Sequence, residues 1–291
     1  MELYKHQKDF LKQNPNKSAL VWSCGIAKTR TALEWSKLYE GKTLAITPKF
    51  LVANWKREMD KWGVHIDILS KENFRKNHKK LKKYEQIIVD EIHTGFLTPN
   101  FKSQMSKSLK WYLKEREVKR FLGCSATVYS SSPWNIYNLT YYIGHKIDWL
   151  KFKYLFFEDI RFGRKIISVP KKGCEKGLAK IVNKIANVVD IKDCMDVPLQ
   201  FHSPPEYLNL TKEQEKEIKN NYDPLPIVRY TMQHEIENGV LKGNEFKMPK
   251  VFKIDKNERI LDLVKENSKV AIVARYNDQI DVLYDLLREY K

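Results

Sequence analysis

Residues 22–29, Trp-Ser-Cys-Gly-Ile-Ala-Lys-Thr, have the residue types of a loop that could bind phosphate groups. They follow a short apolar run and precede a segment with helical periodicity, which is the setting that phosphate-binding loops require. Backbone N–H groups at the start of a helix point toward bound anions, the Lys28 ammonium could reach the β- and γ-phosphates, and the Thr29 hydroxyl could bind Mg²⁺. The predicted nucleotide-binding residues of this loop are Gly25, Ile26, Ala27, Lys28, Thr29 and Arg30.

The loop departs from the usual phosphate-binding pattern at two positions. A glycine normally stands directly before the lysine and another six residues before it, where this chain has Ala27 and Trp22. Gly25 is the one glycine in residues 22–29. If the backbone at position 27 needs a positive φ angle, alanine there costs about 1 to 2 kcal/mol. The loop taken alone is therefore weak evidence for a nucleotide site.

Two carboxylates and a histidine follow another apolar run, which spans residues 87–89 and is typical of a buried strand. A strand that delivers Asp90 beside the phosphate loop would allow its carboxylate to hold Mg²⁺, and Glu91 could then orient or deprotonate the attacking water. The alternative is that Asp90 and Glu91 only end a strand at the surface. The predicted catalytic residues are Lys28, Asp90 and Glu91, and the predicted Mg²⁺ ligands are Thr29 and Asp90.

A third apolar run ends in small hydroxyl residues at Ser125 and Thr127. Open α/β sheets bind ligands at the carboxyl edge of their strands, where these hydroxyls could hydrogen-bond the acidic pair and respond to the phosphate state. The alternative is an ordinary turn after a strand. The residues predicted to couple nucleotide state to the rest of the protein are His93, Ser125, Ala126 and Thr127.

Short apolar runs rich in β-branched residues alternate with helical segments, and this alternation is typical of an α/β fold with a parallel sheet. The predicted strands cover residues 18–22, 43–47, 64–69, 86–90, 120–124 and 269–274. Between residues 49 and 62, the apolar side chains recur at spacings of four, four and three. Their positions predict a helix whose one face packs on the sheet, formed by Leu51, Trp55, Met59 and Trp62.

Three parts are expected along the chain. Residues 1–145 carry the regular α/β rhythm and the three candidate motifs. In residues 146–253 this rhythm is lost, and proline and glycine interrupt a more polar segment, which indicates a helical insertion and connector. A helical pattern resumes at Ile254, followed by a strand-like run and a final helix. Residues 254–291 are therefore expected to begin a second α/β unit.

Five segments, in order, resemble motifs of the Swi/Snf-type branch of superfamily II helicases and translocases. They are Leu-Tyr-Lys-His-Gln-Lys-Asp-Phe-Leu at residues 3–11, residues 47–58, the Asp-Glu-x-His box at residues 90–93, Ser-Ala-Thr at residues 125–127, and Pro-Trp-Asn-Ile-Tyr-Asn-Leu at residues 133–139. Together they span about half of the chain. Residues 207–214 and 269–280 are similar, more loosely, to the segment before the second lobe and to the start of that lobe.

The resemblance implies a RecA-like parallel sheet with helices on both faces, and ATP hydrolysis with Mg²⁺ between two such lobes. It assigns Gln7 to recognition of the adenine base, and Lys49 and Asn54 to the nucleic-acid backbone. The implied partner is nucleic acid, double-stranded DNA above all, bound without sequence preference. The family's last motifs, whose arginines complete the ATP site from the second lobe, have no counterpart before Lys291. Hydrolysis by this chain alone is therefore expected to be weak.

Charge also favours a polyanionic partner, because 53 basic and 36 acidic residues give a formal net charge of +17. A generally lysine-rich proteome would explain the same excess. Residues 71–83 hold seven basic residues and one acidic residue, which could neutralise phosphates or form a solvated helix face. Four isolated cysteines indicate neither a zinc site nor a disulfide framework. No apolar run is long enough to span a membrane, so a cytoplasmic monomer is expected, in the host cytoplasm if a phage encodes it.

Three functions are therefore open at the level of sequence. The first is an ATP-dependent motor, a helicase or a translocase on duplex DNA. The second is a nucleotide- and DNA-binding module with little hydrolysis of its own, for which Ala27 and the early end of the chain at Lys291 are the motivation. The third is the ATPase part of a restriction or repair complex, because such complexes share these motifs.

Overall fold

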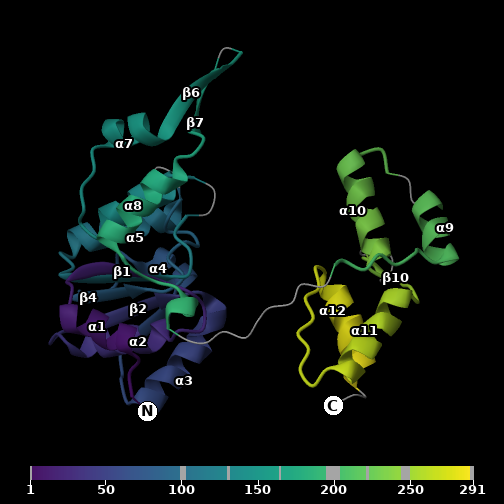
Figure 1. Cartoon of the computed structure of the whole chain (residues 1–291), viewed down its shortest axis with the longest axis horizontal. Coiled ribbons are helices and arrows are strands. Elements are labelled where there is room, and N and C mark those ends of the chain that lie inside the picture. The colour runs from purple at the N-terminus through teal and green to yellow at the C-terminus, as the bar shows by residue number, and fades with distance from the viewer. Residues whose placement is uncertain are drawn as a thin grey trace. The chain divides into compact units, whose positions relative to one another are not determined.

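The computed structural model describes residues 2–98, 103–129, 132–163, 165–194, 204–220, 223–243 and 250–288. The chain divides into two compact units, Met1–Leu199 and Gln200–Lys291 (Figure 1). The two boundaries expected from the sequence, after residue 145 and after residue 253, each fall inside one of these units. The three-part division stays a prediction.

The first unit is built on one six-stranded parallel sheet with the order β3-β2-β4-β5-β1-β8. The expected α/β class with a RecA-like parallel sheet is confirmed. Its strands are β1 (Lys17–Trp22), β2 (Thr43–Thr47), β3 (Asp67–Ser70), β4 (Gln86–Val89), β5 (Arg120–Ser125) and β8 (Asn187–Val189). Strand β5 lies between β1, which precedes the loop, and β4, which directly precedes Asp90, and it is hydrogen-bonded to both.

Two of these strands differ from the sequence prediction. The expected strand at residues 64–69 begins only at Asp67, because Gly63 ends the preceding helix in a left-handed conformation and the Val64 N–H still bonds to the Met59 carbonyl oxygen. Strand β8, which pairs with β1, was not predicted. Its three residues are too few to show a periodicity, and Val188 is exposed.

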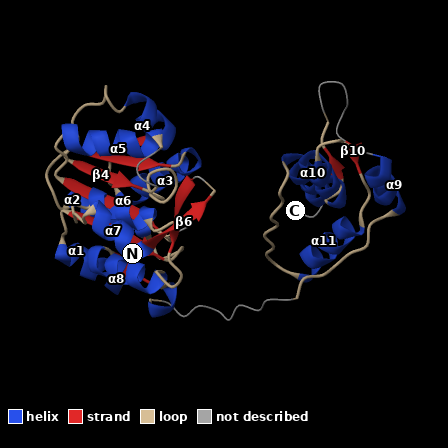
Figure 2. Cartoon of the chain, turned by 90° about the horizontal axis from the view of Figure 1, so that it is seen from above, coloured by secondary structure: helices blue, strands red, loops and turns tan. Residues whose placement is uncertain are grey.

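Helices cover both faces of the sheet, and each face has its own hydrophobic core. Figure 2 shows helices on both sides of the strands of the first unit. One core joins Leu20, Ile88 and Leu122 to helices α1 (Lys5–Gln13), α2 (Lys28–Lys37) and α3 (Val52–Trp62). The other joins Ile46, Val89 and Phe121 to helices α4 (Lys71–Asn77), α5 (Gln104–Glu115), α6 (Trp134–Tyr142) and α8 (Glu175–Ile185). The alternation of neighbouring β4 residues between the two cores follows from the period of two in a strand.

The apolar face predicted for residues 49–62 is confirmed. A short 3₁₀ helix, η1 (Lys49–Leu51), leads into α3. Trp55 and Met59 are buried, and Leu51 and Trp62 pack against the same core. Helix α3 is thereby fixed beside the carboxyl edge of the sheet.

The segment expected to be a helical insertion also contains extended structure. After α7 (Trp149–Phe156) comes an antiparallel hairpin of β6 (Phe157–Phe162) and β7 (Lys165–Pro170). Helix α8, strand β8 and a short 3₁₀ helix, η3 (Ile191–Asp193), then return the chain to the sheet. Residues 157–194 therefore contribute to the first unit.

The second unit has a small core around Ile236, Phe252 and Ile254. Its elements are α9 (Lys212–Asn220), α10 (Pro226–Glu237), β9 (Val240–Leu241), β10 (Lys250–Val251), α11 (Asp255–Glu266) and α12 (Asn277–Leu287). The two helical patterns after Ile254 are confirmed, whereas the strand predicted at residues 269–274 is wrong. In the described part of this unit no strand lies beside that segment, and Val273 is 96% exposed, so its backbone has no ladder to join.

Within the described ranges, no helix is long and apolar enough to cross a membrane.

Candidate nucleotide-binding site

In the loop between β1 and α2, the backbone at position 27 has the positive φ angle whose presence the sequence could not decide. Gly25 has a φ angle of +85°, and Ala27 has φ +62° and ψ +42°, which is the left-handed region. Position 27 therefore needs the conformation that glycine normally supplies in such loops. Alanine adopts it at a cost of about 1 to 2 kcal/mol, so the surrounding contacts must hold it there.

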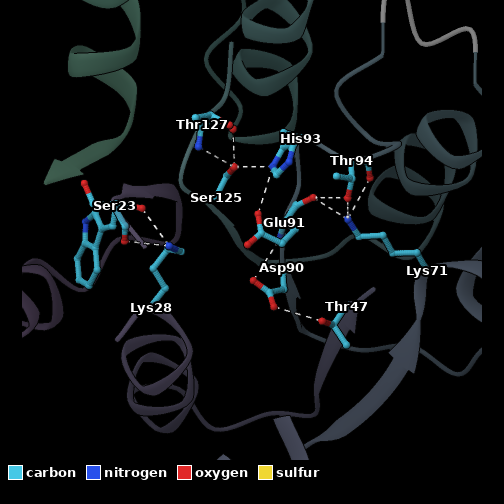
Figure 3. A network of polar contacts seen from close by, with 11 residues as sticks. Ser23, Lys28, Thr47, Lys71, Asp90, Glu91, His93, Thr94, Ser125 and Thr127 are labelled. Carbon is cyan, nitrogen blue, oxygen red and sulfur yellow. Dashed lines mark hydrogen bonds and ion pairs between the residues drawn. The ribbon is translucent and has the colours of Figure 1, made fainter. Parts of the chain in front are cut away.

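Lys28 is the first residue of α2, and its ammonium group folds back over the loop. It donates hydrogen bonds to the carbonyl oxygens of Trp22 at 3.0 Å and Ser23 at 3.1 Å (Figure 3). An ammonium group has three N–H donors, so these bonds use two of them. The positive charge thus lies directly beside the N-terminus of α2, where an anion would also meet the helix dipole.

Asp90 directly follows β4 and is held from three sides. Its Oδ2 accepts hydrogen bonds from the Trp55 indole nitrogen at 2.8 Å and from the Thr47 hydroxyl at 3.2 Å. Its Oδ1 accepts one from the Glu91 backbone N–H at 3.0 Å. The sequence predicted Trp55 only as part of an apolar core face. The hydrogen bond to Asp90 could not be predicted from that pattern, because a tryptophan can bury its ring in the core and still donate a hydrogen bond through its indole nitrogen.

Glu91 has a left-handed backbone, with φ +45°, although it is not glycine. Its carbonyl oxygen accepts hydrogen bonds from the Lys71 ammonium at 2.6 Å and from the Thr94 hydroxyl at 2.8 Å. The same ammonium donates to the Thr94 carbonyl oxygen at 3.0 Å and contacts the Thr94 hydroxyl (Figure 3). Lys71 and Thr94 together therefore hold the backbone at the predicted catalytic carboxylate.

Lys71 is 3% exposed, which is unusual for a lysine. Burial lowers the pKa of Lys71 from 10.5 to about 8, and the neighbouring carboxylates of Asp90, Glu91 and Glu72 oppose this shift. The sequence predicted that the basic run containing Lys71 contacts either phosphates or solvent. For Lys71 both predictions are wrong, because its side chain is buried against the backbone of Glu91 and Thr94. The remaining basic residues of the run are exposed, and Lys82 and Lys83 pair with Asp67 and Glu117.

Three of the four residues predicted for coupling, His93, Ser125 and Thr127, form one chain of polar contacts that ends at Glu91. His93 Nδ1 lies 3.2 Å from Glu91 Oε2 and 2.8 Å from the Ser125 hydroxyl oxygen. The Ser125 hydroxyl donates to the Thr127 carbonyl oxygen and accepts from the Thr127 N–H at 3.1 Å (Figure 3). Ala126 lies between them and is half-buried. Ser125 therefore reaches the acidic pair through His93, and not directly as predicted.

The loop between β1 and α2 and the acidic box, which is the segment Asp90–His93, both contribute to the lining of one cavity of about 450 Å³. The residues predicted for nucleotide binding and catalysis that line it are Gly25, Ala27, Lys28, Thr29, Arg30, Asp90 and Glu91. Ile26 is not among them, because its side chain is fully buried in the core and only its backbone could face a ligand. A larger cavity, about 590 Å³, is lined by Thr43 and Asp67 at the opposite, amino edge of the sheet and contains none of the predicted residues.

Gln7 also lies outside the lining of this cavity and is fully buried. Its Oε1 accepts from the Tyr4 N–H at 2.9 Å, and its Nε2 donates to the Thr31 hydroxyl at 2.9 Å and the Ala27 carbonyl oxygen at 3.4 Å. The predicted contact of Gln7 with a base would require some of these bonds to break. In this arrangement the amide ties α1 to the loop and to α2.

The two residues predicted to contact nucleic acid lie in different settings. Lys49 is exposed at the start of η1, directly after β2 and Pro48. Asn54, by contrast, lines the cavity, and its Oδ1 lies 3.4 Å from an Arg57 guanidinium nitrogen. Contact of either residue with nucleic acid stays a prediction.

The chain matches no protein-family model and no curated protein sequence. Among solved structures, it is similar to the helicase domain of Hef from Pyrococcus furiosus, with 16% identity and a TM-score of 0.42 over 49% of this chain and 36% of that one. It is also similar to the UvsW helicase from bacteriophage T4, with 13% identity and a TM-score of 0.39 over 48% of this chain and 58% of that one. The matched region thus spans less than two thirds of either structure.

Proposed function

We propose that the chain is the ATP-binding lobe of a nucleic-acid motor, which hydrolyses ATP and moves along double-stranded DNA. The observation that carries this proposal is the cavity shared by Lys28 and Thr29 of the loop and by Asp90 and Glu91 of the acidic box. Phosphoryl transfer to water needs positioning, charge neutralisation and an oriented nucleophile. These four residues supply the groups that each of these tasks requires.

The residues present fit a Mg²⁺ ion. Mg²⁺ prefers oxygen ligands, and Thr29 and Asp90, which carry a hydroxyl and a carboxylate, both line the cavity. The Asp90 oxygens accept three hydrogen bonds from the protein, out of about four acceptor positions on a carboxylate. Bound there with the nucleotide, the ion would neutralise charge on the phosphates. Lys28 would exchange its loop carbonyls for phosphate oxygens.

Glu91 is the residue that would orient the attacking water. Its side chain is about a quarter exposed, and its carboxylate lies against His93. His93 in turn contacts Ser125 at the end of β5, the strand that is hydrogen-bonded to both β1 and β4. A change in the contacts of Glu91 upon hydrolysis would therefore reach the central strand of the sheet through two contacts.

The nucleic-acid partner follows from charge and from the sequence resemblance. A net charge of +17 attracts a polyanion, and the exposed Lys49 lies just beyond the carboxyl end of β2. Backbone contacts of this kind position a duplex without reading its sequence. The resembled family places further arginines on a second lobe, so turnover by this chain alone is expected to be slow.

The experiment is ATP turnover at low salt, with and without duplex DNA. We expect DNA to stimulate turnover, and Lys28→Ala and Glu91→Gln each to lower it roughly a hundredfold, because each removes a group that acts on the reacting phosphate or water. Lys12→Ala, which removes an exposed lysine of α1, is the matched control for charge. Turnover that persists in both Lys28→Ala and Glu91→Gln would refute the assignment of the site.

Nucleotide binding can be measured separately from hydrolysis through Cys24. This thiol is exposed and lines the cavity, whereas Cys124 and Cys174 are buried. We expect Mg²⁺ and ATP to protect Cys24 from a maleimide reagent, with Cys24→Ser as the variant that identifies the labelled site. Protection without turnover, even with DNA, would favour a nucleotide- and DNA-binding module over a motor.

A further inference from the structure

The side-chain amide of Gln7 forms its hydrogen bonds with other groups of the protein. Its oxygen and nitrogen bond to Tyr4, Thr31 and Ala27, and the side chain has no exposed surface. An amide that reads the edge of a base needs a donor and an acceptor that face the ligand. In this structure the donor and the acceptor of Gln7 both face inward.

The cavity contains a different group of side chains beyond its phosphate end. Arg30 is the residue after Thr29, and its guanidinium carbon lies 3.7 Å from the centre of the Trp62 ring. The Trp62 indole nitrogen donates to Glu58 at 2.8 Å, and Arg30 donates to the Glu2 carbonyl oxygen at 3.1 Å. Arg30 and Trp62 are thus anchored separately, and together they form part of the cavity wall, in which Trp62 is half-buried and Arg30 is 8% exposed.

Tyr4 adds a second aromatic ring to the same wall. It is 44% exposed, lines the cavity, and precedes α1 directly. A guanidinium group and aromatic rings attract the face of any nucleobase, because every base presents a π surface. Such a wall holds a base without reading the hydrogen-bonding groups on its edge.

We propose that the base of the bound nucleotide stacks on the Arg30–Trp62 pair and Tyr4 instead of bonding to Gln7, so that the site takes purine nucleoside triphosphates in general. This proposal rests on the proposed nucleotide site and names its substrate class. Adenine and guanine differ at the edge of the ring and share the stacking face. Gln7 then acts on the loop, since it holds the carbonyl oxygen of the left-handed Ala27.

The test is the binding of ADP and GDP, with Mg²⁺, by isothermal titration calorimetry. We expect dissociation constants within about tenfold of each other in the wild-type protein, and Trp62→Ala to weaken both by about tenfold to a hundredfold. Trp62→Phe keeps an aromatic face and should retain most of the affinity. Trp149→Ala, which removes a 40% exposed tryptophan of α7, is the matched control.

Gln7→Glu distinguishes the two modes of base recognition. It keeps an acceptor for Tyr4 and removes the amide donor, so stacking predicts an unchanged ratio of ADP to GDP affinity. A preference for ADP of more than about a hundredfold that disappears in Gln7→Glu would overturn the proposal and leave the nucleotide site standing. Unchanged binding in Trp62→Ala would also overturn it. Absence of binding by either nucleotide would refute the nucleotide site itself, and the base proposal with it.

Discussion

The Lys71 ammonium, at the start of α4, donates a 2.6 Å hydrogen bond to the backbone carbonyl oxygen of Glu91. A left-handed conformation costs a residue with a Cβ atom about 1 to 2 kcal/mol, and it persists where neighbouring contacts fix it. At Glu91 these contacts come from Lys71 and Thr94. The direction of the carboxylate that would orient water therefore depends on a lysine from a neighbouring helix.

Replacement of this lysine should affect turnover more than nucleotide affinity. In Lys71→Met we expect the rate of ATP hydrolysis to fall by about tenfold or more, because the left-handed backbone at Glu91 loses its charged hydrogen bond. The dissociation constant for ATP should change by less than about threefold. Lys79→Met, an exposed lysine of the same basic run, is the control. Single-turnover kinetics and calorimetry measure the two quantities, and a loss of affinity without a loss of rate would contradict this role.

The stability of the protein should depend on pH through the same residue. Its pKa is about 8 in the folded protein and 10.5 without perturbation, so between these values the unfolded state binds more protons. The free energy of unfolding of the wild type should therefore rise with pH relative to Lys71→Met, by up to about 1.4 kcal/mol per pH unit. Urea unfolding followed by tryptophan fluorescence measures this in the first unit, because all seven tryptophans lie there. Equal pH dependence in the two proteins would contradict the burial of a charged Lys71.

Ala27→Gly should stabilise the first unit by about 1 kcal/mol, because glycine adopts the left-handed conformation without the clash of a Cβ atom. The matched control is Ala53→Gly at an exposed helical position in α3, which should destabilise by about 0.5 to 1 kcal/mol. Urea unfolding of the two variants should thus give changes of opposite sign. A loss of stability in both would show that position 27 is not left-handed in solution.

Trp55→Phe should raise the Mg²⁺ concentration needed for half-maximal turnover by about tenfold. The change keeps an aromatic ring in the core and removes the hydrogen bond to Asp90, and bonds to charged groups contribute about 1.5 to 3 kcal/mol. Trp35→Phe is the control, since Trp35 is equally buried and its indole nitrogen bonds to the Pro15 carbonyl oxygen. Both variants should lose some stability, and only Trp55→Phe should change the Mg²⁺ dependence.

The parts of the fold that follow from local patterns could be predicted from the sequence. Strands β1, β2, β4 and β5 lie within one residue of the expected ranges, because continuous apolar runs are typical of strands buried on both faces. The helix with Trp55 and Met59 on one face follows from spacing alone. Juxtaposition of the loop and the acidic box in one cavity also agrees with the sheet edge expected for them.

The parts that depend on distant contacts could not be predicted. Lys71 belongs to a run of lysines that are otherwise exposed, and its burial becomes visible only when α4 lies against the acidic box. The inward-facing amide of Gln7 likewise depends on Thr31, which is 24 residues away. The absence of a strand at residues 269–274 has the same origin, because an apolar run forms a strand only beside another strand.

The position of β5 between β1 and β4 has a consequence for the order in which the site can form as the chain is synthesised. The phosphate loop leaves the ribosome early, but β1 has neither of its neighbours until β5 and then β8 have followed. Until then, both edges of β1 and the edge of β4 that faces away from β2 present free backbone groups to other chains. A nascent chain that stops before Ser125 would therefore carry both halves of the nucleotide site without the strand that joins them.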